Sequence, residues 1–336
     1  MATFDLSELS KYIANSKKVT ITTHVSPDGD ALGSSLAMQL FVKKLGIEST
    51  VITPDDYPDF LRWLPEQESV LKYEKDKNEC EAWVKTSDLI ICLDFNTADR
   101  MSTLRQTIEE SPAPKVLIDH HQNPVQWTDV LLSDSSASST AELVYRIIDG
   151  LGHVDLIDKE IGTCLYTGIV TDTGSFKFPQ TSWETMLIGS KLMKLGVDTP
   201  KIQNLIYDNS SEHRLRLLGF SLTERLEINQ KYSTAIIGLD ASDLEEHNFQ
   251  AGDTEGIVNY PLSISSVKMS VLITEKKGQV RMSFRSKGDV PVHDIANKYF
   301  KGGGHKNAAG GISALSVRET VTYLKSILPE FHEFLC

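Results

Sequence analysis

The fold is decided by a strand–turn–helix segment near the N-terminus, KVTITTHVSPDGDALGSSLAMQLFVKKLG (residues 18–46). Residues 18–23 are rich in β-branched side chains, which favour a β-strand. Residues 31–45 follow a helical pattern, and Gly46 marks the expected end of that helix. Pro27 and Gly29 predict a turn between the two elements. The segment therefore predicts a βα unit.

Strands and helices continue to alternate through the first half of the chain. The further predicted strands are residues 49–53, 89–93 and 115–118. The apolar run 89–93 is typical of a strand buried on both faces. Ser139-Thr140-Ala141-Glu142 predicts a capping box before an apolar helix at 143–148, and Ile161, Leu165 and Ile169 share one face of another helix. This alternation predicts an α/β domain with a mostly parallel sheet flanked by helices.

The second half has a different pattern. Residues 183–220 are mainly helical and contain Gly196 and Pro200, which suggests a connector. Strands are predicted at 232–239, 264–274 and 279–285, with a hairpin turn at 276–278, a helix at 295–300 and a glycine-rich turn at 302–304. We therefore predict three regions: an α/β domain at 1–185, a helical linker at 186–222 and a smaller α+β domain at 223–336.

Composition narrows the class of protein. No apolar run approaches the roughly 18 residues of a spanning helix, and the polar N-terminus has no signal-peptide core, so we expect a cytoplasmic protein without membrane association. The cysteines, Cys80, Cys92, Cys164 and Cys336, are scattered and indicate neither disulfides nor a zinc knuckle. The net charge of −12 argues against binding long nucleic-acid duplexes. Residues 268–306 nevertheless carry nine Lys/Arg against three Asp/Glu, a local balance of +6.

Ionisable residues follow the predicted strands at the edge where an open parallel sheet binds its ligands. They are His24, Asp28 and Asp30 after the first strand, Asp94 after 89–93, and Asp119-His120-His121 at the end of 115–118. Asp172 follows an apolar helix. Each residue alone has an ordinary explanation, as a turn residue, a helix cap or a hydrogen-bonded pair. Packing gives no reason for so many carboxylates at one edge, so together they predict a functional site.

Carboxylates and imidazoles without a thiolate suit Mn²⁺ or Mg²⁺. The candidate ligands are too many for one ion, and carboxylates this close need positive charge between them to stay ionised. Two divalent cations about 3.5–4 Å apart and bridged by one carboxylate satisfy both conditions. Such a pair activates a water molecule to attack a phosphorus centre. We therefore predict a two-cation phosphoesterase site.

These motifs resemble those of the DHH phosphoesterases, in the family's order. Asp119-His120-His121 is similar to the motif that names the family, and His24-x-x-x-Asp28-x-Asp30, Asp94 and Thr171-Asp172-Thr173-Gly174 resemble the other three. The resemblance implies one cation on His24, Asp28 and Asp94, and a second on Asp30, Asp94, His120 and Asp172, with Asp94 bridging. It further implies that Asp119 orients neighbouring ligands. His121 would face the scissile phosphate as a hydrogen-bond donor or proton shuttle.

The segment GGGHKNAAG (residues 302–310) resembles the glycine-rich signature of the DHHA1 domain. Consecutive glycines let backbone N–H groups approach an anion closely, and His305 follows them. Arg281 and Arg285 lie four apart on a predicted strand and so share one face. We predict that Arg281, Arg285, Gly303, Gly304 and His305 bind substrate, although a plain turn and a solvated strand face are the alternatives.

Within the family, the chain is similar to the branch that degrades short oligoribonucleotides (nanoRNA) and 3′-phosphoadenosine 5′-phosphate. This similarity implies Mn²⁺, with Mg²⁺ as the alternative, acting on short single-stranded RNA or DNA, linear dinucleotides or nucleoside bisphosphates, and a homodimer. A second hypothesis is an inorganic pyrophosphatase or exopolyphosphatase, which acts on substrates without a base. A third is a nucleotide-binding module without turnover.

Overall fold

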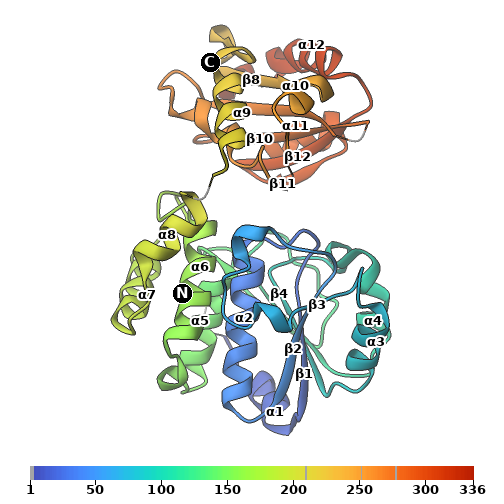
Figure 1. Ribbon diagram of the computed structural model, residues 1–336, viewed down its shortest axis with the longest axis vertical. Helices are drawn as coiled ribbons and strands as arrows, with labels where there is room; N and C mark the ends of the chain where they lie inside the picture. Colours follow the sequence, from blue (N-terminus) through green and yellow to red (C-terminus); the bar gives the residue numbers. More distant parts are fainter. Residues whose placement is uncertain (1–3, 209, 251, 277) are drawn as a thin grey trace. The chain divides into compact units, whose positions relative to one another are not determined.

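The computed structural model describes residues 4–208, 210–250, 252–276 and 278–336, which form two compact units, Met1–Asn209 and Ser210–Cys336 (Figure 1). We call them unit 1 and unit 2. The division falls inside the range 186–222 that the sequence suggested as a connector. None of the helices in the described ranges is long and apolar enough to cross a membrane.

Unit 1 is built on a six-stranded sheet in which every pair of neighbours is parallel. Its strands are β1 (Lys18–Thr22), β2 (Glu48–Thr53), β3 (Leu71–Lys72), β4 (Leu89–Leu93), β5 (Lys115–Asp119) and β6 (Val130–Ser133). Their order is β3-β2-β1-β4-β5-β6. The predicted parallel sheet is therefore present, and β3 and β6 extend it at its two edges.

Helices cover both faces of this sheet. They are α1 (Ser7–Asn15), α2 (Gly29–Lys44), α3 (Lys77–Lys85), α4 (Arg105–Glu110), α5 (Thr140–Gly150), α6 (Lys159–Asp172), α7 (Trp183–Lys194) and α8 (Thr199–Tyr207), with 3-10 turns η1 (Asp59–Leu61), η2 (Gln67–Ser69), η3 (Ala98–Leu104) and η4 (Val154–Leu156). Alternate residues of β4 enter different cores: Ile91 packs with the α2, α5 and α6 side, and Ile90 with the α3 and α4 side. Both faces are buried, as the apolar run predicted.

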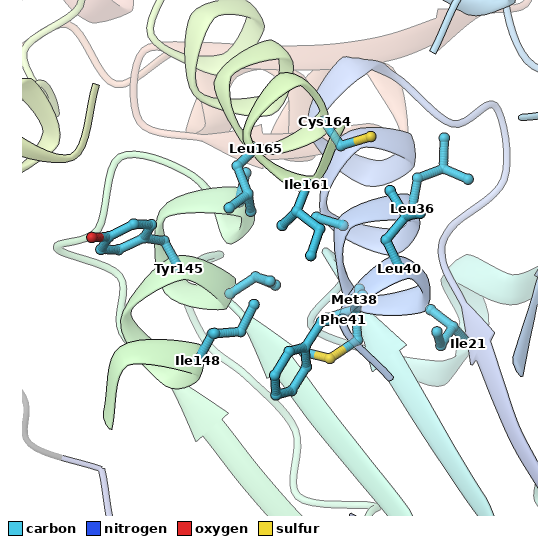
Figure 2. Packing of buried hydrophobic residues seen from close by; sticks show 14 of the residues in the cluster. Ile21, Leu36, Met38, Leu40, Phe41, Tyr145, Ile148, Ile161, Cys164 and Leu165 are labelled. Atoms are coloured by element: carbon cyan, nitrogen blue, oxygen red, sulfur yellow. The ribbon is translucent and has the colours of Figure 1, made fainter. Parts of the chain in front are cut away.

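Helices α2 and α6 approach each other closely, and two glycines permit the approach. A Cβ on Gly33 would lie 2.6 Å from the carbonyl oxygen of Cys164, and one on Gly168 would lie 2.6 Å from Asp30 Oδ1. Figure 2 shows the adjoining core, where Leu36 of α2, Ile161 of α6 and side chains from α5 and β1 gather. This packing brings the end of α6 to the start of α2.

One local prediction is corrected in α5. The Ser139 hydroxyl accepts from the backbone N–H of Glu142, as an N-cap should. The Glu142 carboxylate does not return to Ser139, because its Oε2 instead accepts from the hydroxyls of Ser138 at 2.6 Å and Thr185 at 2.7 Å. The predicted capping box is thus only half formed. The buried Glu142 links α5 to the first turn of α7.

Unit 2 contains a mixed sheet in the order β11-β12-β10-β9-β8-β7, in which only the pair β8–β9 is parallel. Its strands are β7 (Leu226–Asn229), β8 (Thr234–Leu239), β9 (Met269–Lys276), β10 (Gln279–Ser286), β11 (Gly303–His305) and β12 (Ala308–Ser313). Its helices are α9 (Glu212–Thr223), α10 (Ala241–Glu246), α11 (Val292–Phe300), α12 (Val317–Ile327) and α13 (His332–Leu335), with 3-10 turns η5 (Gln230–Tyr232), η6 (Ile257–Ser263) and η7 (Leu328–Phe331). This is the predicted α+β architecture.

Two predictions in unit 2 are wrong in detail. Strand β9 begins at Met269 and not at residue 264, because residues 264–268 form a bend and a turn, in which Val267 N donates to the carbonyl of Ile264 at 3.1 Å. The glycine-rich stretch is not a plain turn, because Gly303 and Gly304 belong to β11 and pair with Gly310 and Ala309 of β12. In the predicted hairpin between β9 and β10, Lys277 lies outside the described residues.

Candidate metal centre

The site lies at the carboxyl ends of three strands that are direct neighbours in the sheet, β1, β4 and β5. His24 follows β1, Asp94 follows β4, and Asp119 ends β5 before His120 and His121. The chain winds from β1 toward β3 and then returns to place β4 on the other side of β1. Such a switch point is where open α/β sheets bind ligands.

Asp94 occupies the centre of the site and is 2% exposed. Its Oδ2 lies 3.4 Å from His24 Nε2, whereas its Oδ1 lies 3.6 Å from His120 Nε2. The two oxygens of one carboxylate therefore face two different histidines. The residue adopts φ +69°, a left-handed conformation that is uncommon outside glycine and is often found at functional sites.

The six predicted ligands, together with His121, form three overlapping groups, within each of which one ligand atom per residue lies within 4.8 Å of the others. The groups are His24/Asp28/Asp94, Asp30/His120/Asp172 and Asp94/His120/His121. In the second group, His120 Nε2 lies 3.3 Å from Asp172 Oδ2 and 3.9 Å from Asp30 Oδ2. All six ligands predicted from the sequence thus converge, and their oxygen and imidazole donors suit hard divalent cations.

Backbone carbonyls orient two of the imidazoles. His24 Nδ1 lies 2.8 Å from the carbonyl oxygen of Val25, and His120 Nδ1 lies 3.4 Å from that of Ala137. A proton on each Nδ1 is favoured by these contacts, which turns the Nε2 lone pairs toward the carboxylates. Metal-binding histidines are commonly held in this way.

Asp119 lies behind the site and is fully buried. Its Oδ1 is 2.7 Å from His121 Nδ1, and that nitrogen is 3.8 Å from Asp94 Oδ1. The carboxylate of Asp119 therefore fixes the orientation of the His121 ring. Burial alone would lower the pKa of His121, but the hydrogen bond to Asp119 and the charge of Asp94 outweigh it and raise that pKa.

The carboxylates of the site do not titrate alike. Burial and the negative charges of Asp94 and Asp172 raise the pKa of Asp30 well above its usual range. Loss of water and the charges of Asp28 and Asp94 raise the pKa of Asp172 to about 7, although His120 opposes the rise. Burial would also raise the pKa of Asp94, but its histidine neighbours lower it. This crowding of carboxylates is the condition that bound cations relieve.

Three residues of unit 1 that were not among the predicted site residues contact or influence the site. Thr140 and Ala141 donate backbone N–H groups to the two oxygens of Asp30, at 2.6 and 2.8 Å. The backbone carbonyl of Arg100 accepts a hydrogen bond from the N–H of Val25 at 2.8 Å. The positive charge of its side chain acts to lower the pKa values of His24 and His121. The cap at Ser139 could have pointed to α5. No sequence signal set Arg100 apart.

The predicted substrate-binding residues all lie in unit 2. Arg281 and Arg285 are on the same side of β10, where Arg281 is exposed and contacts Gln279. Arg285 is half-buried, and its Nη1 donates to the carbonyl of Phe284 at 2.9 Å. Burial lowers the pKa of Arg285. Gly303 and Gly304 are in β11, and the side chain of His305 lies outside the part that the structure describes.

Comparison with known proteins identifies the family of the chain. Residues 18–169 match the model of the DHH family N-terminal domain, and residues 229–329 match that of the DHHA1 domain. The bifunctional oligoribonuclease and PAP phosphatase NrnA of Thermus thermophilus is 31% identical over 87% of this chain and 83% of its own length. The chain belongs to the DHH–DHHA1 family of phosphoesterases.

Two further relatives of this DHH–DHHA1 protein span almost its whole length. NrnA of Bacillus subtilis, also named a bifunctional oligoribonuclease and PAP phosphatase, is 28% identical over 90% of this chain and 92% of its own. A crystal structure of an exopolyphosphatase-related protein from Bacteroides fragilis superposes with a TM-score of 0.96 and 35% identity, covering 98% of this chain and 97% of that one. Both domains are therefore shared with these proteins.

Proposed function

We propose that this phosphoesterase uses two divalent cations, Mn²⁺ foremost, to hydrolyse short oligoribonucleotides, linear dinucleotides and nucleoside 3′,5′-bisphosphates. The division of the Asp94 carboxylate between His24 and His120 is the observation that carries the proposal. A carboxylate so placed can bridge two ions. The names of the NrnA relatives support the substrate class, and we expect the enzyme to act in the cytoplasm.

The proposed roles follow from the contacts. When bound, two divalent cations supply a water nucleophile at neutral pH and neutralise charge on the phosphate. His24 and Asp28 would hold one ion of the pair, and Asp30, His120 and Asp172 would hold the other. His121, oriented by Asp119, donates a hydrogen bond to the substrate phosphate or carries a proton to the leaving oxygen.

Unit 2 is proposed to recognise the nucleotide. Among the described residues no carboxylate forms an ion pair with Arg285, and a guanidinium that has lost part of its water is a suitable partner for phosphate. We expect Arg285→Ala to raise KM for nucleotides while leaving KM for a small chromogenic phosphodiester unchanged. We expect the same change in KM for nucleotides from His305→Ala. Arg318→Ala, on the exposed side of α12, is the control, and equal losses on both substrates would contradict a recognition role.

A side-by-side turnover assay tests the proposal. Purified protein is given a short RNA, a linear dinucleotide, a nucleoside 3′,5′-bisphosphate and pyrophosphate, each with Mn²⁺, with Mg²⁺ and with a chelator. We expect mononucleotide or phosphate release from the first three substrates with Mn²⁺ and none with the chelator. The matched variants are Asp94→Asn, which removes the shared ligand, and Asp99→Asn, an exposed residue paired with Arg105. Turnover that survives Asp94→Asn would contradict the two-cation site.

Pyrophosphate or polyphosphate hydrolysis is the second candidate. The name of the Bacteroides fragilis relative, an exopolyphosphatase-related protein, favours testing it. Adding polyphosphate to the same assay distinguishes this activity from the hydrolysis of nucleotides. Faster release from polyphosphate or pyrophosphate than from every nucleotide would favour this alternative.

We further propose that two copies of the chain associate through the outer face of α7. The exposed apolar side chains of this face are Trp183, Met186, Leu187 and Met193, with Trp183 71% exposed. Glu184 lies in the first turn of α7, and Lys191 and Lys194 lie in its last turn, so an antiparallel pair of such helices brings opposite charges together. Large exposed apolar patches commonly mark protein–protein interfaces.

Light scattering after size exclusion measures the association. Met186→Glu should convert a dimer into a monomer, whereas Leu215→Glu, an equally exposed apolar residue on α9, should not. A monomeric wild-type protein at micromolar concentration would contradict this proposal.

A further inference from the structure

The N-terminus of α5 contacts two carboxylates of the metal centre. Thr140 Oγ1 donates to Asp94 Oδ1 at 2.9 Å, and Thr140 N donates to Asp30 Oδ2 at 2.6 Å. Ala141 N donates to Asp30 Oδ1 at 2.8 Å. Thr140, Asp30 and Asp94 are all buried. A single residue therefore binds both carboxylates, one through its hydroxyl and the other through its backbone.

The hydroxyl contact fixes the rotation of the Asp94 carboxylate. The terminal torsion of an aspartate has a broad preference and does not set the carboxylate plane by itself. With Oδ1 held by Thr140, that oxygen faces His120 at 3.6 Å and Oδ2 faces His24 at 3.4 Å. A different rotation would break the bond to Thr140 and turn the oxygens away from the two histidines.

The helix itself is anchored firmly enough to serve as a reference point. Ser139 caps its first turn, and Glu142 is hydrogen-bonded to Ser138 and Thr185. The backbone N–H groups of the first turn of a helix have no acceptor within the helix, and two of them here donate hydrogen bonds to Asp30. The position of Asp30 is therefore tied to the position of Thr140.

We propose that Thr140 is a positioning residue of the metal centre, whose hydroxyl aligns the Asp94 carboxylate so that each oxygen faces one cation. The inference rests on the proposed two-cation function and extends it to a residue outside the ligand set. The hydroxyl would act on cation binding through Asp94, to which it is hydrogen-bonded. Its loss should weaken the binding of Mn²⁺ on the His120 side, which Oδ1 faces.

The test compares three variants by isothermal titration with MnCl₂ alone. Thr140→Val keeps the shape of the side chain but removes the donor, and Thr140→Ser keeps the donor. Thr22→Val is the matched control, because Thr22 ends β1, is fully buried, and its Oγ1 has no hydrogen-bond partner among the described residues. Thr140→Ala replaces the valine variant if the latter does not fold, as judged by its melting temperature without metal.

We expect Thr140→Val to bind one of the two Mn²⁺ ions about 10–100-fold less tightly than wild type, the usual effect of removing a group that supports a ligand. Thr140→Ser and Thr22→Val should stay close to wild type. In turnover assays, Thr140→Val should lose kcat at low Mn²⁺ and regain it as Mn²⁺ is raised, with KM for the nucleotide unchanged. A merely structural role does not produce this rescue by metal.

Two outcomes overturn the inference. One is Mn²⁺ binding by Thr140→Val that equals wild type, and the other is an equal loss in Thr140→Val and Thr22→Val. Failure of the proposed function is a separate result, because wild-type protein itself would then bind no pair of Mn²⁺ ions or release no product. If the wild type binds and turns over while Thr140→Val is indistinguishable from it, only this inference fails.

Discussion

Gly168 on α6 offers a sharp test of how the helices position the site. A methyl group on Gly168 would lie 2.6 Å from Ala141 Cβ and 2.6 Å from Asp30 Oδ1, and real Cβ atoms do not approach so closely. Gly168→Ala therefore has to push α5 or the Asp30 carboxylate aside. Gly189 in α7 is the control, because a methyl group there would meet Phe176 at 3.4 Å, an ordinary contact.

The expected changes in the free energy of unfolding have opposite signs in Gly168→Ala and Gly189→Ala. Replacing glycine by alanine inside a helix stabilises by about 1 kcal/mol. At Gly168, overpacking costs about 1–3 kcal/mol, and weakening one hydrogen bond to a charged carboxylate costs about 1.5–3 kcal/mol. Gly168→Ala should therefore lose about 1.5–5 kcal/mol of unfolding free energy, whereas Gly189→Ala should gain up to about 1 kcal/mol.

Urea unfolding in the presence of a chelator measures both values without a contribution from bound metal. Manganese titration of the same proteins should show weaker binding only for Gly168→Ala, by about tenfold or more, because Asp30 is displaced from the N–H groups that hold it. The reasoning is refuted if Gly168→Ala is as stable as wild type and binds Mn²⁺ equally well.

Three further predictions concern single side chains. Asp94→Asn should reduce turnover with Mn²⁺ to below about a tenth of wild type, and higher residual activity would contradict a bridging role. The melting temperature should change little, because asparagine tolerates the left-handed backbone of this residue. Arg100→Gln should raise KM for nucleotides about tenfold, because it removes the positive charge that acts on the histidines of the site. Arg105→Gln, which removes an arginine paired with Asp99 and Glu109, should leave KM unchanged, and equal kinetics of the two variants would contradict a role of Arg100 in the site. Asp134→Asn should destabilise the protein at pH 7, because hydrogen bonds from Ser136 and an arginine of α5 outweigh burial and lower the pKa of Asp134 below its ordinary 3.8. This stabilisation is present above that value and is lost as pH falls through the lowered pKa, so unfolding curves of the two proteins should converge in acid and a constant gap would contradict the assignment.

Much of unit 1 could be predicted from the sequence because its signals are local. The β-branched run before His24 and the apolar run before Asp94 are short, and each forms the predicted strand; the apolar run is buried on both faces, as its composition predicts. The ends of these runs place the ionisable residues at one edge, since parallel strands present their carboxyl ends together. Local signals were weaker in unit 2, where β9 starts later than predicted and Gly303 pairs in a strand.

The sequence alone thus determined the alternation of elements, the edge of the sheet that carries the site and the kinds of atoms found there. Only the tertiary structure decided that β1, β4 and β5 are adjacent, that α6 brings Asp172 to the site, and that α5 holds Asp30 and Asp94. The physical reason is the range of the interactions. Hydrophobic period and turn chemistry act between neighbours in the chain, whereas Asp30 of α2 and Ala141 of α5 are 111 residues apart. They meet beside Gly168 of α6, whose lack of a side chain leaves room for both.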